Sequence, residues 1–190
     1  MKVTIRNIAD VYTGVFASIA SEGELVYLQT RHFDDSGRLQ AALFPDLERE
    51  KRLDKHLLKS GDVLFAAKGT RNFALHYEEK NVPAVASTSF FVIRLRHTAT
   101  NTILPAYLAW SINHPKKMSY LKSLARGTSM VSISKSALAA LEIEVPPLHI
   151  QQMILKISEL RHSEKELLER IEKLKEQCLQ QQILIAISKT

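Results

Sequence analysis

Cysteine is almost absent from this chain of 190 residues, and Cys178 carries its only thiol. A single cysteine excludes an internal disulfide and a zinc site built from several cysteines, and it is typical of a reducing compartment such as the cytoplasm. Glycine and proline number only 6 each, which excludes collagen-like and low-complexity chains. No apolar run approaches the roughly 20 residues that span a bilayer. Arg6 and Asp10 interrupt the N-terminal stretch, so it is a poor signal peptide. We therefore expect a folded, cytoplasmic protein.

Acidic residues are missing from residues 80–141, which contain eight basic residues. Residues 1–79 hold 11 basic and 12 acidic residues, and residues 142–190 hold 7 and 8, so the window contains the whole excess behind the net charge of +6. Positive charge concentrated in this way favours a polyanionic partner such as nucleic acid. The alternative is that these basic side chains pair with acidic residues from elsewhere in the fold.

Pro146 and Pro147 divide the chain into two parts of different character. Residues 1–146 mix strand-like and helix-like segments, and because strands gather before helices, we expect an α+β fold. The expected strands are residues 25–28, 63–67, 73–77, 89–95 and 141–145, and the expected helices are residues 47–58, 105–110, 116–125 and 134–141. Residues 148–190 contain neither glycine nor proline, so we expect the second part, residues 147–190, to form one long helix.

The predicted C-terminal helix carries an apolar stripe with heptad spacing. With Ile150 at position a, nine of the twelve a and d positions are apolar, counting the cysteine. The stripe residues are Ile150, Met153, Ile157, Leu160, Leu167, Ile171, Leu174, Cys178 and Ile185. A stripe of this kind needs a partner helix. At on the order of 60 Å, the helix is too long for its own domain to cover it. We therefore expect an intermolecular coiled-coil partner, with the helices parallel or antiparallel; the alternative is packing on the globular part.

Two glycine-containing segments combine cations with small hydrogen-bond donors, which is the chemistry of phosphate contacts. The first surrounds Gly69, directly after the predicted strand 63–67, and the second surrounds Gly127, after the predicted basic helix 116–125. The candidate DNA-binding residues are Lys68, Thr70, Arg71, Asn72, Lys80, Lys116, Lys117, Lys122, Arg126, Thr128 and Ser129. The alternatives are an ordinary β-turn at the first segment and a helix C-cap at the second. Whether these residues contact bases or phosphates stays open.

Known catalytic motifs are missing from the sequence. It contains no P-loop, GxGxxG, HExxH or GxSxG motif, and its seven histidines show no metal-ligand spacing. Asp46, Glu48 and Glu50 lie in a run of alternating charge that is typical of a solvated helix face. We therefore expect a non-catalytic protein without a metal or a cofactor.

Four segments follow one another in a familiar order. They are IADV at residues 8–11, LKSGDVLF at residues 58–65, RGTSMVSIS at residues 126–134 and VPPLHIQQ at residues 145–152. This order resembles the DNA specificity (S) subunits of type I restriction–modification systems over nearly the whole chain. Ile150 departs from the family pattern, which usually has an acidic residue before the glutamine.

The resemblance implies a target recognition domain at residues 1–146 and a dimerisation and spacer helix at residues 147–190. Full-length family members carry two such units in tandem, whereas this chain carries one and is similar to a half-subunit. A homodimer would restore two recognition domains and read a bipartite site. The implied partners are double-stranded DNA, a DNA methyltransferase (modification) subunit and a restriction subunit that joins through it. The alternatives are a structural adaptor or orphan specificity fragment that binds polyanions non-specifically, and a small nuclease.

Overall fold

The computed structural model describes residues 1–34, 37–39, 42–69, 71–78, 82–125 and 132–188. The chain divides into two compact units, Met1–Gln151 and Gln152–Thr190. The first unit is a mixture of strands and short helices, and the second is helical. The predicted α+β domain followed by one long C-terminal helix is therefore confirmed. The functional assignment of residues 1–146 and 147–190 stays a prediction.

The strands of the first unit form three small sheets. They are β1 (Lys2–Thr4), β2 (Ala9–Thr13), β3 (Val26–Leu28), β4 (Val63–Ala66), β5 (Ala74–His76), β6 (Ala84–Ala86), β7 (Phe90–Leu95) and β8 (Glu142–Glu144). The largest sheet is antiparallel, with strand order β2-β7-β4-β5. Strand β1 pairs antiparallel with β8, and β3 pairs parallel with β6.

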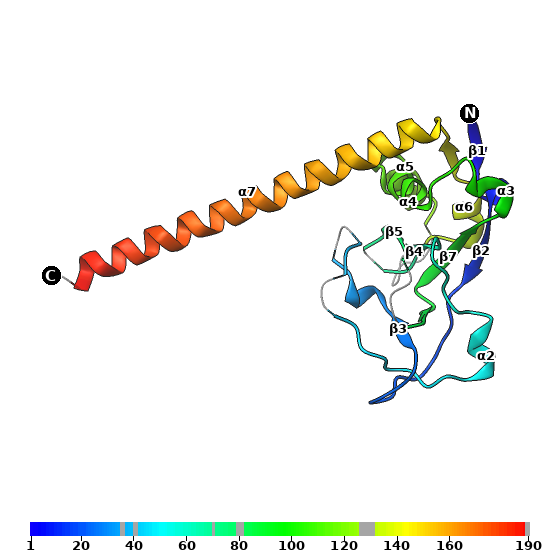
Figure 1. Cartoon of the computed structure of the whole chain (residues 1–190), viewed down its shortest axis with the longest axis horizontal. Coiled ribbons are helices and arrows are strands. Elements are labelled where there is room, and N and C mark those ends of the chain that lie inside the picture. Colours follow the sequence, from blue (N-terminus) through cyan, green and yellow to red (C-terminus); the bar gives the residue numbers. More distant parts are fainter. Residues whose placement is uncertain (35–36, 40–41, 70, 79–81, 126–131, 189–190) are drawn as a thin grey trace. The chain divides into compact units, whose positions relative to one another are not determined.

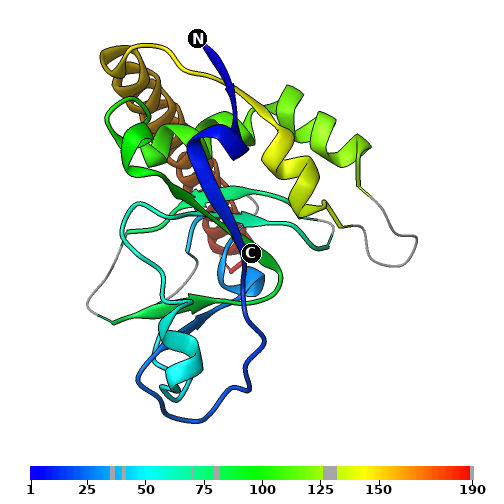
Figure 2. The same ribbon diagram turned by 90° about the vertical axis from the view of Figure 1, so that its right-hand side faces the viewer.

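The longer helices of the first unit lie at one end of it (Figure 1, Figure 2). The helices are α1 (Ile5–Ile8), η1 (Thr30–His32), α2 (Lys51–Asp54), α3 (His97–Thr100), α4 (Pro105–Asn113), α5 (Pro115–Ser123), α6 (Lys135–Ala140) and α7 (Leu148–Ser188). Helix α4 packs against β4 and β5. Two views show α4, α5 and α6 at one end of this unit and α2 with β3 at the other (Figure 1, Figure 2).

The core lies around the buried strand β4, all four residues of which are inaccessible to solvent. On one side, the rings of Phe33, Phe73 and Phe90 meet with centroids 5.9–6.2 Å apart. Aromatic pairs at this spacing add roughly 0.5–1.5 kcal/mol each to the effect of burial. This packing holds β4 in place, and the turn that follows β4 is one of the two predicted binding segments.

Most predicted elements are present, but the helix predicted at residues 47–58 is wrong. Only α2, a single turn, is helical there. Leu47 instead pairs with Leu25 through N–H···O bonds of 3.0 and 3.1 Å in the two directions, and Leu57 bridges to Val85. Backbone pairing with neighbouring strands and burial of Leu47 therefore override the helical charge pattern.

Candidate nucleic-acid interface

The turn after β4 presents the first predicted binding segment. Gly69 has φ +97°, and a Cβ placed there would meet no other atom within 4 Å. Glycine adopts this conformation without the steric cost that a side chain brings. Lys68 and Arg71 on either side are exposed, whereas Thr70 lies outside the described residues. The backbone at this turn is thus open to close approach, with cations beside it.

Asn72 holds this turn together. Its side-chain amide donates to the Ala66 carbonyl over 3.0 Å, next to the backbone bond from the Ala66 N–H to the Phe73 carbonyl. The amide predicted as a hydrogen-bond donor to DNA therefore has a partner inside the fold. In this structure Asn72 positions the cations of the turn.

The residues that follow the second predicted segment lie beside this turn. Lys68 forms an antiparallel bridge with Ser132, and the N–H of buried Ile133 donates to the Ala67 carbonyl over 2.9 Å. Arg126, Thr128 and Ser129 lie outside the described residues, as does Lys80. Ser132 and Ile133, which follow this segment, thus lie next to the Gly69 turn, although more than 50 residues separate them from it in sequence.

Helices α5 and α6 flank the second segment and carry further cations. Lys116 and Lys122 of α5 and Lys135, the first residue of α6, are exposed. Ser134 caps α6 by accepting a bond of 3.1 Å from the Ala137 N–H. We call Lys68, Arg71, Lys122 and Lys135 the basic cluster, because they lie on the Gly69 turn or on the two helices that flank the second segment in sequence.

Lys117 differs from the other lysines of α5. Its ammonium donates to Glu144 Oε2 and, over 3.1 Å, to Ser111 Oγ, and only 17% of its side chain is exposed. The hydrogen bond from Lys117 holds the pKa of the Glu144 carboxyl below its usual value. Lys117 thus joins α5 to β8, and its charge is compensated within the fold.

The acid-free window is partly neutralised by acids outside it. Arg94 pairs with Asp62, Arg96 with Asp10 and Lys117 with Glu144. Three of the six described cations of residues 80–141 are therefore used internally. In the part of the chain that the structure describes, Lys116, Lys122 and Lys135 have no ion-pair partner. The excess positive charge that is left lies mainly on α5 and at the start of α6.

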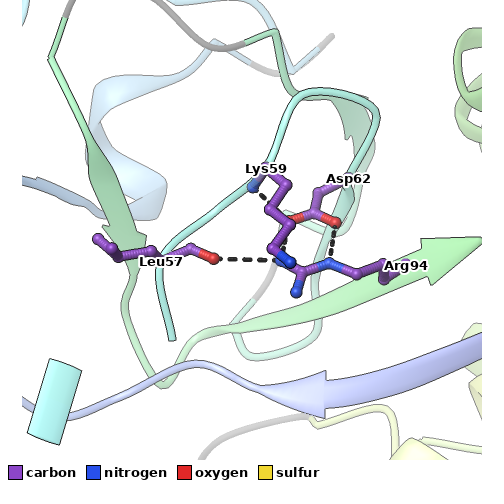
Figure 3. A network of polar contacts seen from close by, with 4 residues as sticks. All are labelled: Leu57, Lys59, Asp62 and Arg94. Atoms are coloured by element: carbon purple, nitrogen blue, oxygen red, sulfur yellow. Dashed lines mark hydrogen bonds and ion pairs between the residues drawn. The ribbon is translucent and has the colours of Figure 1, made fainter. Parts of the chain in front are cut away.

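A buried ion pair that sequence reasoning missed fixes the start of β4. The Arg94 guanidinium donates to Asp62 Oδ1 over 2.7 Å and to Asp62 Oδ2 over 2.6 Å (Figure 3). Asp62 also accepts from the Lys59 N–H over 2.8 Å, and Arg94 donates to the Leu57 carbonyl over 3.1 Å. The bonds to Asp62 raise the pKa of Arg94. The only signal in the sequence is that Asp62 lies within the segment LKSGDVLF.

Gln151 anchors the first turn of α7 to the globular unit. Its side chain is fully buried; it accepts from the Leu104 N–H over 3.0 Å and donates to the carbonyls of Thr102 and Pro146 over 2.7 and 2.8 Å. All three hydrogen bonds of the Gln151 side chain are formed with backbone groups. Gln151, the first of the two glutamines in the segment VPPLHIQQ, thus has a structural role that the sequence alone did not reveal.

The predicted heptad stripe of α7 is exposed along most of its length. Met153, Ile157, Leu160, Leu167, Ile171, Leu174 and Ile185 are 47–61% exposed, Cys178 is exposed and Ile150 is half-buried. The stripe does not include every exposed apolar residue of α7. The others beyond residue 160 are Leu168, Leu179, Ile183, Leu184 and Ile187. Helix pairing through the stripe stays a prediction.

Two further properties concern the described residues only. No group of three or more His, Cys, Asp and Glu side chains among them is arranged to hold a metal ion. None of the helices they form combines the length and apolarity needed to cross a membrane.

Comparisons with known proteins agree with this architecture. The family model described as "Type I restriction modification DNA specificity domain" matches residues 42–175, more than half of the chain. A search of the curated proteins found no match.

Solved structures show the same fold at low identity. The chain is similar to an S subunit from M. genitalium (TM-score 0.58, 16% identity, 84% of this chain covered) and to the HsdS subunit from Thermoanaerobacter tengcongensis (0.59, 15%, 90%). It is also similar to a chain from a structure on complex assembly and conformational transition of the type I R-M system (0.61, 15%, 90%). This chain spans only 38–40% of the length of those chains.

Proposed function

Because the chain belongs to the family of type I restriction–modification DNA specificity domains, we propose that it is a sequence-specific DNA-recognition subunit of a type I restriction–modification complex. In this role it is non-catalytic and acts in the cytoplasm. It directs a DNA methyltransferase subunit, and a restriction subunit where one is present, to a bipartite site. Two copies pair through α7, so that two recognition domains face the DNA.

The observation that supports this function most directly is the junction at Ser132. The Gly69 turn meets the residues that follow the second predicted segment there, and the basic cluster lies on this turn and on the helices that flank that segment in sequence. Lysine and arginine side chains beside an open backbone position a protein on DNA phosphates. Arginine can in addition read guanine through two hydrogen bonds. The junction therefore offers lysine side chains that can position the protein on phosphates and an arginine side chain that can recognise a base.

The salt dependence of DNA binding tests whether the basic cluster contacts phosphates. We expect Lys68→Ala and Lys122→Ala each to make the plot of log K for DNA binding against log salt concentration less steep, reducing the magnitude of its slope by about one. Each lysine that contacts a phosphate releases about one counterion. Lys51→Ala is the matched control, because Lys51 is an exposed lysine on α2, at the opposite end of the same unit (Figure 1). The placement fails if the control lowers the slope as much as the two variants do.

A second test concerns sequence reading. Replacing Arg71 and Arg126 by alanine should weaken binding to the cognate site. If the methyltransferase complex continued to methylate that site unchanged with both variants, the assignment of these arginines would be wrong.

A polyanion-binding adaptor without sequence preference is the second candidate function. The exposed lysines Lys68, Lys122 and Lys135 favour it, because lysine contacts with phosphates bind any polyanion and carry no sequence information. The ratio of specific to random DNA affinity separates the two functions. A specificity subunit gives a ratio of roughly 10³ or more, whereas an adaptor binds every sequence equally.

A further inference from the structure

Two polar residues interrupt the apolar stripe of α7, and their positions make the stripe complementary to itself. Glu164 occupies an a position and Gln181 a d position, and both are exposed. We infer that two antiparallel copies of α7 pair in a single register, the one in which Glu164 of one copy faces Gln181 of the other. This inference rests on the proposed homodimer with antiparallel helices, and it adds the register in which they pair.

Parallel pairing in register brings like charges together. It places Glu164 against Glu164 of the second copy inside the seam, because equal a positions face one another. Residues at g also approach residues at e of the next heptad, which sets Lys156 against Arg161 and Arg170 against Lys175. Like charges at these positions oppose pairing, and e and g charges are what set orientation in coiled coils.

Antiparallel pairing sets each a residue against a d residue, and the register decides which. If Glu164 faces Gln181, Leu167 faces Cys178 and Ile171 faces Leu174. Further out, Leu160 faces Ile185 and Ile157 faces Ser188. The Gln181 amide can then donate to the Glu164 carboxylate, so that both polar side chains in the seam gain a partner. The paired stretch covers residues 157–188, all within the helical unit.

Sliding one helix by a heptad destroys this match in either direction. In one direction Glu164 faces Leu174 and Gln181 faces Ile157. Arg170 then also lies beside Arg170 of the second copy, which brings two positive charges together. In the other direction Gln181 faces Ile171, and Lys175 lies beside its own copy. A polar group left opposite an apolar side chain loses its hydrogen-bond partner, which costs more than pairing the two polar groups. In the inferred register no like charges meet: Leu168 flanks Lys175, and Arg170 flanks Gln177.

The native thiol of Cys178 provides a direct test. Leu160, Leu167 and Leu174 are all d positions, 54–61% exposed and one heptad apart, and each faces Cys178 in one of the three antiparallel registers. Leu160→Cys, Leu167→Cys and Leu174→Cys in the full-length chain are therefore matched reporters. A heptad displaces the sulfur by about 10 Å along the helix, beyond the reach of a disulfide.

The readout is dimer formation under mild oxidation on a non-reducing gel. We expect Leu167→Cys to cross-link at least about tenfold faster than Leu160→Cys, since only the thiols at 167 and 178 share a high effective concentration. Adding Cys178→Ser to Leu167→Cys should abolish the cross-linked dimer. Fastest cross-linking of Leu160→Cys, or a Leu174→Cys cross-link that is lost when Cys178→Ser is added, would overturn the register. Rapid cross-linking of the unmodified chain through Cys178 alone would overturn the antiparallel direction.

Light scattering and DNA binding on the same samples separate this inference from the proposed function. A monomer that shows no cross-link overturns the register and the homodimer. If the same samples still prefer one DNA sequence, the recognition function stands without them. Loss of sequence preference together with strong Leu167→Cys cross-linking would have the opposite meaning: the dimer would be right and the DNA function wrong.

Discussion

Removing the Asp62 carboxylate should destabilise the globular unit strongly. Asp62 is 1% exposed and accepts three hydrogen bonds, two from Arg94 and one from the Lys59 N–H. Breaking a buried pair by removing one partner costs about 3–5 kcal/mol. The Arg94 side chain is 28% exposed and keeps its bond to the Leu57 carbonyl, so for Asp62→Ala we expect the lower end, about 3 kcal/mol.

Urea denaturation followed by tryptophan fluorescence measures this loss. Trp110 is the only tryptophan and lies on α4, so its signal reports on the globular unit rather than on α7. A loss of about 3 kcal/mol lowers the urea midpoint by roughly 1–2 M and removes a large part of a typical total stability of about 5–15 kcal/mol.

A double variant shows whether the loss comes from the charge left unpaired. Asp62→Leu combined with Arg94→Met removes both charges, and we expect it to be within about 1 kcal/mol of the unmodified protein. A loss below about 1 kcal/mol for Asp62→Ala, or a double variant no more stable than Asp62→Ala, would refute the reasoning.

Three further changes test the other contacts. Gln151→Ala should cost about 1–3 kcal/mol in the same urea assay, because it leaves buried backbone groups of the 102–104 segment and Pro146 unpaired; an unchanged midpoint would contradict this. Gly69→Ala should cost about 1–2 kcal/mol, since its φ is +97° and space is not limiting, and should weaken DNA binding; equal affinity would contradict the role of the turn. Glu144→Gln should lower Tm at pH values above the ordinary glutamate pKa. The pKa of Glu144 in the folded protein is lowered, so the stabilisation that its carboxylate provides is present above the ordinary pKa and is lost as pH falls through the lowered pKa. A Tm difference that is the same at every pH would contradict the ion pair with Lys117.

The long helix and the buried strands were predictable because their signals are local. Absence of glycine and proline after Pro147 predicts α7, and the apolar run at residues 63–67 predicts β4. The segment 47–58 was not predictable in this way. Its alternating charges indicate a helix, whereas its structure depends on pairing between Leu47 and Leu25, 22 residues apart.

The candidate interface was predictable only in part, for a similar reason. Residue types around Gly69 and Gly127 indicated two binding segments, but the contact of Lys68 with Ser132 follows from the tertiary fold. The charge count also could not show that Arg94 and Lys117 are neutralised by Asp62 and Glu144, which lie outside the basic window.

Selection from a random pool of double-stranded DNA with the purified full-length chain tests the central claim most directly. The account predicts enrichment of one sequence that consists of two half-sites related by two-fold symmetry, because a symmetric dimer presents two identical recognition domains. Competition against random DNA should then give a specificity ratio of roughly 10³ or more at physiological salt. A pool that shows no enrichment after repeated rounds, with binding that depends on salt but not on sequence, would contradict DNA recognition by this chain.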